Sequence, residues 1–276
     1  MGLRSKMIAG AFACMSALSL AVIPAHAAEG NFVSFGDSIP ADPTPGDYLN
    51  DKISKAVNAP GKNNLNCATN PNGFAAQAAA RLNLDLADYS CAGASAFTGG
   101  QHISAQVDKA IADGKLNAGT KVVSIMAGFN DTYPHYINKT LSAADIRARY
   151  VGEMSAQINR IKAAAPQATI KTIGYNQITD GDFVCLVHVG GNASDRTFMP
   201  VMNEIEQLVQ NMQRDTANAT GTQFVDIKPS SAAHGICAPD QDRWISGVVD
   251  LPVVRNLPLH LTVGGHANTA EQIVRS

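Results

Sequence analysis

Five short apolar segments alternate with longer helix-forming segments along this chain, and this alternation limits the fold more than any other feature. Strands are expected at residues 32–35, 84–89, 121–126, 168–175 and 223–227. Helices are expected at residues 73–82, 103–112, 142–165, 197–219 and 265–274. Alternating strands and helices are typical of βαβ units, which build a parallel sheet covered on both faces. We therefore predict a three-layer α/β fold with about five parallel strands.

The N-terminal segment differs from the rest. Arg4 and Lys6 precede an apolar run over residues 7–24, and Ala25-His26-Ala27 follows it. This order of charge, apolar run and small residues predicts a secretory signal peptide, residues 1–27. A membrane anchor is the alternative, but the run is short and rich in Ala and Ser. Residues 28–276 are enough for a single domain with a sizeable core.

The composition is that of a globular protein, with 45% hydrophobic and 16% charged residues. Two of the 21 basic residues lie in the predicted signal peptide, whereas none of the 23 acidic residues does. The remaining chain is therefore acidic and has no basic stripe. This charge balance argues against nucleic acids and anionic membranes as electrostatic partners.

Four cysteines remain after Cys14 is removed with the signal peptide. Cys67, Cys91, Cys185 and Cys237 allow three disulfide pairings. We favour sequential pairing, Cys67 with Cys91 and Cys185 with Cys237, because it closes the shortest loops. A zinc site using Cys185 and His188 is the alternative, but the sequence has no second pair with such spacing and export implies an oxidising compartment.

A candidate nucleophile follows the first apolar strand. The run 32–35 ends at Gly36, and Asp37 and Ser38 come next. A strand that ends in this way places a serine hydroxyl at the carboxyl edge of a sheet, where open α/β folds bind their ligands. Gly-Asp-Ser is also a common turn sequence. The chain has no G-x-S-x-G motif, so it lacks the nucleophile elbow of the α/β-hydrolases.

Three later positions are candidates to work with this serine. Gly93 follows a strand, and a glycine lets a backbone N–H approach a substrate closely. Asn130 follows the next strand and could donate an amide N–H to an oxyanion. His260 is the best candidate for a base. Each position has a simpler interpretation, as a turn residue or a structural histidine. The other histidines of the exported chain are His102, His135, His188, His234 and His266.

These positions carry a resemblance to a known family. Gly36-Asp37-Ser38, Gly93, Gly128-x-Asn130 and His260 are similar in order and rough spacing to the four sequence blocks of the SGNH (GDSL-type) hydrolases. The segment 90–94, Ser-Cys-Ala-Gly-Ala, resembles the Ser-Cys-x-Gly-Ala of secreted actinobacterial esterases and lipases. The resemblance spans residues 32–266 and implies a flavodoxin-like α/β/α sandwich.

The resemblance also implies a role for each position. Ser38 would be the nucleophile and His260 the general base. The backbone N–H groups of Ser38 and Gly93 and the side-chain amide of Asn130 would form the oxyanion hole. The implied reaction is the hydrolysis of a carboxylic ester through an acyl-serine intermediate, with no metal and no organic cofactor.

The residue that would orient His260 is where the sequence departs from the family. Most members have an aspartate three residues before the histidine, but this chain has Leu257. Asp250 and Asp242 are the nearest upstream carboxylates, and a backbone carbonyl near Leu257 is the other candidate. We favour the carbonyl, because some secreted relatives resemble such Ser-His dyads.

A second departure follows His260 directly. Leu261-Thr262 stands where the family often has Pro-Asn, whereas Gly265 and His266 match the family pattern.

We expect a secreted monomer acting on a small-molecule or lipid ester, without nucleic acid partners and without stable membrane insertion. The alternatives are an acyltransferase with the same residues and a non-catalytic binding protein on the same fold. The complete set of Ser38, Gly93, Asn130 and His260 argues against the second. Trp244, Phe183, Phe198 and Met199 are candidates to line a substrate groove, although core packing explains each of them as well.

Overall fold

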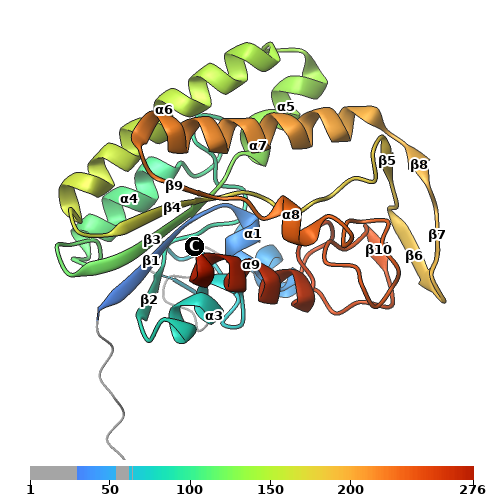
Figure 1. The fold of residues 1–276 in the computed structure, drawn as a ribbon, viewed down its shortest axis with the longest axis horizontal. Helices are drawn as coiled ribbons and strands as arrows, with labels where there is room; N and C mark the ends of the chain where they lie inside the picture. Colours follow the sequence, from blue (N-terminus) through green and yellow to red (C-terminus); the bar gives the residue numbers. More distant parts are fainter. Residues whose placement is uncertain (1–29, 54–61, 64) are drawn as a thin grey trace, which may run out of the picture.

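A five-stranded parallel sheet forms the centre of the molecule (Figure 1). The computed structural model describes residues 30–53, 62–63 and 65–276. The strand order is β2-β1-β3-β4-β9, and all four neighbouring pairs are parallel. The strands are β1 (Asn31–Gly36), β2 (Asp85–Asp88), β3 (Thr120–Met126), β4 (Thr169–Ile173) and β9 (Gln223–Val225). The predicted α/β fold with about five parallel strands is confirmed.

Helices cover both faces of the sheet and complete the three layers (Figure 1). One face carries α4 (Ile103–Ala112), α5 (Phe129–Asn138), α6 (Ala143–Ala164) and α7 (Pro200–Thr220). The other face carries α3 (Phe74–Arg81) and α9 (Val263–Arg275). Ile146, Met154 and Ile158 of α6 are buried at multiples of four residues, which is the spacing of a single helix face.

Cap residues set the ends of the long helices. Ser142 caps α6 by accepting a hydrogen bond from the N–H of Asp145 at 3.1 Å. Gly221 ends α7 with a φ of 60°, a left-handed conformation that favours glycine. Thr262 caps α9 through its side chain. The last helix therefore begins at Val263, two residues earlier than its apolar pattern predicts.

Residues 39–46 contain three prolines and a glycine, a composition that predicts an irregular loop, but this prediction is wrong because most of the stretch is helical. It contains α1 (Ser38–Ala41) and α2 (Pro45–Ile53). Pro40 is the third residue of α1, and Pro45 is the first residue of α2. In the first turn of a helix no backbone N–H needs an intrahelical partner, so proline is tolerated there.

Short strands occupy the long connections at one end of the molecule (Figure 1). β5 (Phe183–Val184) pairs with β8 (Thr197–Phe198), so α7 starts at Pro200 rather than at Thr197. A second small sheet contains β6 (Val187–Gly190), β7 (Ala193–Ser194) and β10 (Val249–Asp250). The connection 226–248 holds the short helix α8 (Lys228–Ser231).

Two disulfides join segments that lie outside the central sheet. Cys67 is bonded to Cys91 and Cys185 to Cys237, which is the sequential pairing. Cys185 is therefore not a free thiolate for zinc, and the His188 ring donates to the carbonyl oxygen of Cys185 at 3.0 Å. The predicted signal peptide lies outside the described residues. Within the described ranges, no helix has the length and apolar character needed to cross a membrane.

Candidate active site

Ser38 lies at the carboxyl edge of the sheet, at the first position of α1. Asp37 caps this helix, because its carboxylate accepts the N–H of Ile39 at 2.9 Å. The N–H of Asp37 donates to the carbonyl oxygen of Met126, at the end of β3, at 3.1 Å. These two bonds fix the backbone on the N-terminal side of Ser38. The serine hydroxyl is thus presented by the helix terminus and the neighbouring strand.

Gly36 allows the sharp change from strand to helix. Its φ is 152°, and a Cβ atom there would lie 2.2 Å from the carbonyl oxygen of Met126. The buried Gln106 amide holds Gly36 from the other side: Oε1 accepts the Gly36 N–H at 2.8 Å, and Nε2 donates to the Gly36 carbonyl at 2.8 Å. The sequence analysis missed Gln106. A glutamine on the buried apolar face of α4 is the signal that could have identified it.

Gly93 and Asn130 lie beside the serine in the same pocket. Gly93 has a φ of 87° within a turn in which the Ala94 N–H donates to the Cys91 carbonyl at 3.0 Å. Asn130 Nδ2 donates to the carbonyl oxygen of Ala94 at 2.8 Å. Since an amide nitrogen carries two hydrogens, one remains available to a ligand. Asn130 therefore has an available donor hydrogen in the pocket that Ser38 and Gly93 also line.

Asp131 holds the loop that follows Gly93. Its carboxylate accepts three backbone N–H groups: Ala96 at 2.7 Å, Phe97 at 2.9 Å and Thr98 at 3.0 Å. Asp131 is fully buried at the start of α5. Asp131 is not among the site residues expected from the sequence, because the partners of this carboxylate are more than 30 residues away along the chain.

His260 is oriented by a backbone carbonyl. Its Nδ1 lies 2.8 Å from the carbonyl oxygen of Pro258. A carbonyl can only accept, so Nδ1 carries the hydrogen and Nε2 carries a lone pair. In the described part of the chain, Nε2 is buried and has no hydrogen-bond partner, so no bond joins it to Ser38. Burial lowers the pKa of His260, and the Pro258 hydrogen bond opposes this shift. A neutral imidazole with a free Nε2 is suited to act as a base.

Neither aspartate considered as a partner contacts His260. Asp250 forms a fully buried ion pair with Arg243, with distances of 2.7 and 2.9 Å to the guanidinium nitrogens. The Asp242 carboxylate accepts from the Gln241 side chain at 3.2 Å. The hydrogen bond from His260 Nδ1 is therefore accepted by the backbone carbonyl of Pro258, the residue after Leu257.

The pocket shared by these residues has a volume of about 490 Å³ and is mainly apolar. Ser38, Gly93, Asn130 and His260 contribute its polar side together with Asp37. The apolar walls are Ile39, Tyr48, Phe129, Tyr133, Ile137, Ile178, Met202, Ile205, Ile245, Leu257, Leu259 and Leu261. Several of these walls come from α5 and α7, so the long helices contribute to the site as well as to the core.

Asp37 borders this pocket in an unusual electrostatic environment. Burial raises its pKa to about 7, while hydrogen bonds from Tyr175 and from the Ile39 N–H lower it, and the nearby Asp131 adds to the rise. The carboxyl next to the candidate nucleophile therefore titrates near neutral pH.

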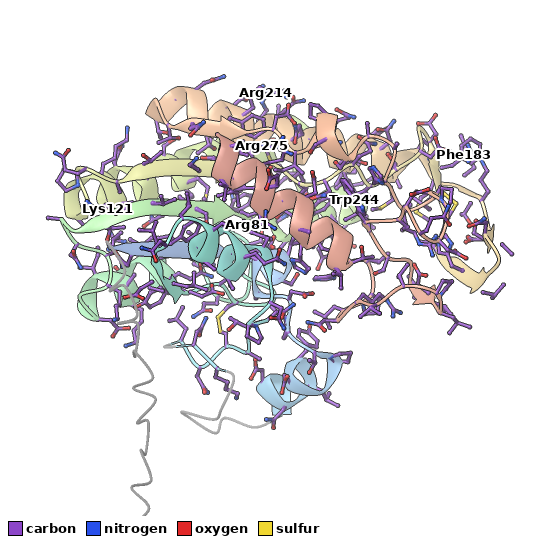
Figure 2. All side chains as sticks on the ribbon, turned by 60° about the horizontal axis from the view of Figure 1, so that its bottom comes forward. Arg81, Lys121, Phe183, Arg214, Trp244 and Arg275 are labelled. Carbon is purple, nitrogen blue, oxygen red and sulfur yellow. A yellow bond between two sulfur atoms is a disulfide. The ribbon has the colours of Figure 1, made fainter. Side chains whose placement is uncertain are left out.

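The four aromatic and methionine residues considered for a substrate groove lie outside this pocket. Its lining does not include Trp244, Phe183, Phe198 or Met199. Trp244 stacks on His234 with ring centroids 3.6 Å apart and packs beside the start of α9, where Figure 2 labels it. Phe183 and Phe198 pack against each other between β5 and β8. Their role is local packing.

No site for a metal emerges within residues 30–53, 62–63 and 65–276. These residues contain no group of three or more His, Cys, Asp and Glu side chains placed to hold an ion.

The model of the GDSL-like lipase/acylhydrolase family matches residues 34–267. The chain belongs to this family. The match covers all four positions that surround the pocket, from Ser38 to His260. Family membership supports hydrolase activity on carboxylic esters. No curated protein matches the sequence.

Solved structures share the fold at low sequence identity. A phospholipase A1 from Streptomyces albidoflavus NA297 superposes with a TM-score of 0.59 and 20% identity, over 90% of this chain and 99% of the other. An extracellular lipase from Streptomyces rimosus superposes with a TM-score of 0.55 and 20% identity, over 89% of this chain and 98% of the other. A putative GDSL-like lipase from Parabacteroides merdae ATCC 43184 superposes with a TM-score of 0.52 and 15% identity, over 90% of this chain and 94% of the other. At these identities the likeness supports the fold.

Proposed function

We propose that this protein is a secreted serine esterase or lipase that hydrolyses carboxylic esters through an acyl-serine intermediate. One observation carries the proposal. His260 Nδ1 donates a hydrogen bond to the Pro258 carbonyl, and its buried Nε2 has no hydrogen-bond partner among the described residues. His260 lines the same pocket as Ser38 and two candidate oxyanion donors. A nucleophile, a base and donors in one pocket are the parts that acyl transfer needs.

The residues divide the reaction into two steps. In the first, Ser38 Oγ attacks the ester carbonyl carbon while His260 Nε2 takes the hydroxyl proton. The N–H groups of Ser38 and Gly93 and the Asn130 amide stabilise the oxyanion. The tetrahedral adduct collapses, and the imidazolium protonates the departing alcohol. In the second step, water attacks the acyl-serine with His260 again as base, which releases the carboxylic acid and regenerates Ser38.

The apolar wall of the pocket suggests which part of the substrate it accepts. Burial of a methylene group contributes about 0.8 kcal/mol, so an apolar pocket of this size favours an alkyl chain over an acetyl group. We therefore extend the proposal to esters of acyl chains longer than acetyl. The two Streptomyces structures are a phospholipase A1 and an extracellular lipase, which is consistent with such substrates.

Export is the second part of the proposal. Two disulfides within the described residues fit an oxidising compartment. The charged, apolar and small-residue pattern of residues 1–27 supplies the signal.

The test is the intact mass of the exported protein after reaction with a fluorophosphonate. We expect one adduct on the wild type, none on Ser38→Ala and much slower labelling of His260→Ala. Folded wild-type protein that forms no adduct would contradict the serine mechanism and favour a binding protein. The unmodified mass also reports whether residues 1–27 are removed and whether four cysteines are oxidised.

Hydrolysis and acyl transfer share the acyl-serine and need a separate assay. We expect the unlabelled wild-type protein to release free fatty acid from a p-nitrophenyl ester at the same rate with and without an added alcohol acceptor. A product ester in place of the free acid would identify an acyltransferase.

A further inference from the structure

Asp42 ends α1 at a fixed position relative to Ser38. Its N–H donates to the carbonyl oxygen of Ser38 at 2.8 Å. Its φ is 41°, in the left-handed region that aspartate and asparagine adopt more readily than most residues. Only 2% of the residue is exposed. The carboxylate is therefore held inside the protein, one helical turn after the candidate nucleophile.

Three donors from three different segments converge on one oxygen of this carboxylate. Asp42 Oδ2 accepts from Asn70 Nδ2 at 2.7 Å, from His266 Nε2 at 2.9 Å and from Asn256 Nδ2 at 3.0 Å. His266 Nδ1 accepts the N–H of Phe74 at 3.2 Å, so the ring hydrogen is on Nε2 and points at Asp42. The direction of every bond in this cluster is thus determined.

Asn256 connects Asp42 to the segment that carries His260. Besides its bond to the carboxylate, Asn256 Nδ2 donates to the backbone carbonyl of Asp42 at 2.6 Å. Asn256 comes two residues before Pro258, whose carbonyl oxygen orients His260. A shift of Asn256 would therefore move the group that fixes the imidazole.

We propose that Asp42 is a positioning residue that ties the Ser38 helix to the His260 segment and compensates for the leucine at position 257. The proposal rests on the function proposed above. Asp42 is not a catalytic residue in this account, since its contacts reach His260 only through Asn256 and the intervening chain.

Asp42 also affects the charge balance around the imidazole. The titratable groups that face His260 from neighbouring segments are Asp42, whose charge raises the pKa of His260, and His266, which has the opposite effect on it. Asp37 borders the same pocket beside Ser38. Loss of the Asp42 charge is therefore expected to lower the pKa of His260 further.

Two substitutions separate the effect of the Asn256 hydrogen bonds from the effect of the Asp42 charge. Asn256→Ala removes both bonds from the His260 segment and keeps the carboxylate. Asp42→Asn can keep an acceptor oxygen for the three donors and removes the charge. The measurement is the second-order rate constant of fluorophosphonate labelling between pH 5 and 9, with wild type alongside. We expect Asn256→Ala to label roughly 10-fold more slowly with an unchanged pH midpoint, because small displacements of a base are costly.

For Asp42→Asn we expect the midpoint of the pH–rate curve to move to lower pH, by about 0.5 pH units or more. Asp226→Asn is the matched control, because this carboxylate also has three donors, but none of them comes from the segment that carries His260. It should lower the melting temperature and leave labelling unchanged. Wild-type rates and midpoints in folded Asn256→Ala and Asp42→Asn would overturn the positioning role. A wild type that never labels would instead contradict the proposed function.

Discussion

His260 and Pro258 form a hydrogen bond of 2.8 Å across two residues of chain, and it occupies the ring nitrogen that a carboxylate partner would need. The side chain of Pro258 is not involved, so the interaction depends on the path of the backbone. Leu259 between them has a φ of 62°, which turns the carbonyl back toward the imidazole. Because a backbone carbonyl orients His260, no side chain has this role, and no single substitution of a carboxylate can remove it.

Asp242→Asn is therefore expected to leave kcat/KM within about two-fold of wild type. Loss of a carboxylate that orients a catalytic histidine costs on the order of 10⁴ in kcat. The Asp242 carboxylate instead contacts Gln241 at 3.2 Å. Steady-state hydrolysis of a p-nitrophenyl ester measures this, and a loss of more than about 10-fold would contradict the orientation of His260 described above.

Gly36→Ala is expected to destabilise the protein by several kcal/mol. The new Cβ would lie 2.2 Å from the Met126 carbonyl and 2.6 Å from Cγ of Pro40, and the φ of 152° disfavours an L residue. Gly152→Ala is the matched control: no atom lies within 4 Å of its added Cβ, and it is inside α6. That change should stabilise the protein by up to about 1 kcal/mol. Urea unfolding of both variants provides the comparison.

The fold was largely predictable because its strands and helices repeat local patterns. The segments at 121–126 and 142–165 are periodic and carry clear end signals, so β3 and α6 match the expectation within a residue or two. The wrong prediction of a loop at residues 39–46 has a simple origin. A proline disrupts the interior of a helix but is tolerated in its first turn, where Pro40 and Pro45 lie. The sequence alone does not show where these short helices begin, so it does not show that the prolines are in first turns.

The candidate site was predictable at the residues that follow strand ends. Ser38, Gly93 and Asn130 each lie within five residues of a strand end, and His260 matches a sequence block. The partners of their supporting residues were not predictable, because Gln106 and Asp131 bond to groups more than 30 residues away in sequence. Asp42 belongs to the same class, since its donors come from positions 70, 256 and 266.

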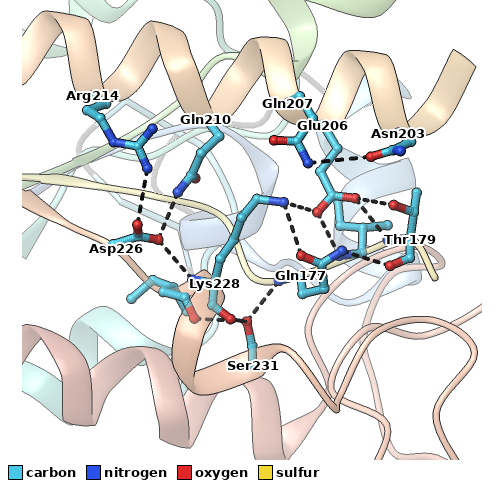
Figure 3. Close-up of polar contacts among 12 residues, drawn as sticks. Gln177, Thr179, Asn203, Glu206, Gln207, Gln210, Arg214, Asp226, Lys228 and Ser231 are labelled. Carbon is cyan, nitrogen blue, oxygen red and sulfur yellow. Dashed lines mark hydrogen bonds and ion pairs between the residues drawn. The ribbon is translucent and has the colours of Figure 1, made fainter. Parts of the chain in front are cut away.

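Figure 3 shows two ion pairs that should differ greatly in their contribution to stability. Glu206 is 2% exposed, pairs with Lys228 and accepts the N–H groups of Ile178 and Thr179 at 3.1 and 2.9 Å. Lys228→Met would leave this buried carboxylate without its cation, at an expected cost of about 3–5 kcal/mol. Since Ile178 lines the pocket, ester hydrolysis should weaken as well.

Arg214→Met is the control within the same figure. The Arg214 and Asp226 side chains are 43% and 34% exposed, so the loss of this pair should cost less than about 1 kcal/mol. Chemical denaturation of the two variants under the same conditions gives the difference. Equal losses of unfolding free energy in Lys228→Met and Arg214→Met would mean that the burial of Glu206 does not determine how much its ion pair contributes to stability.

Asp37→Asn is expected to change how stability depends on pH. The pKa of Asp37 is raised by burial to about 7 in the folded protein, so the folded state binds this proton more tightly than the unfolded state. The wild type should therefore lose stability as the pH rises from about 4 to about 7, by roughly 4 kcal/mol from this group. Asparagine cannot ionise and should remove that loss. Unfolding free energies of both proteins at pH 4 and pH 8 test this, and a constant difference between them would contradict the raised pKa.

Met202→Trp is expected to shift the acyl preference toward short chains. Met202 lies on α7 and lines the apolar side of the pocket, where a larger ring would occupy space needed by an alkyl chain. Each methylene excluded from the pocket removes about 0.8 kcal/mol, so the ratio of kcat/KM for octanoate to kcat/KM for acetate should fall by 10-fold or more. Met199→Trp is the control, because Met199 lies one turn earlier and does not line the pocket. If both variants keep the wild-type ratio, the apolar pocket does not hold the acyl chain, and the exposed outer surface must accept it instead.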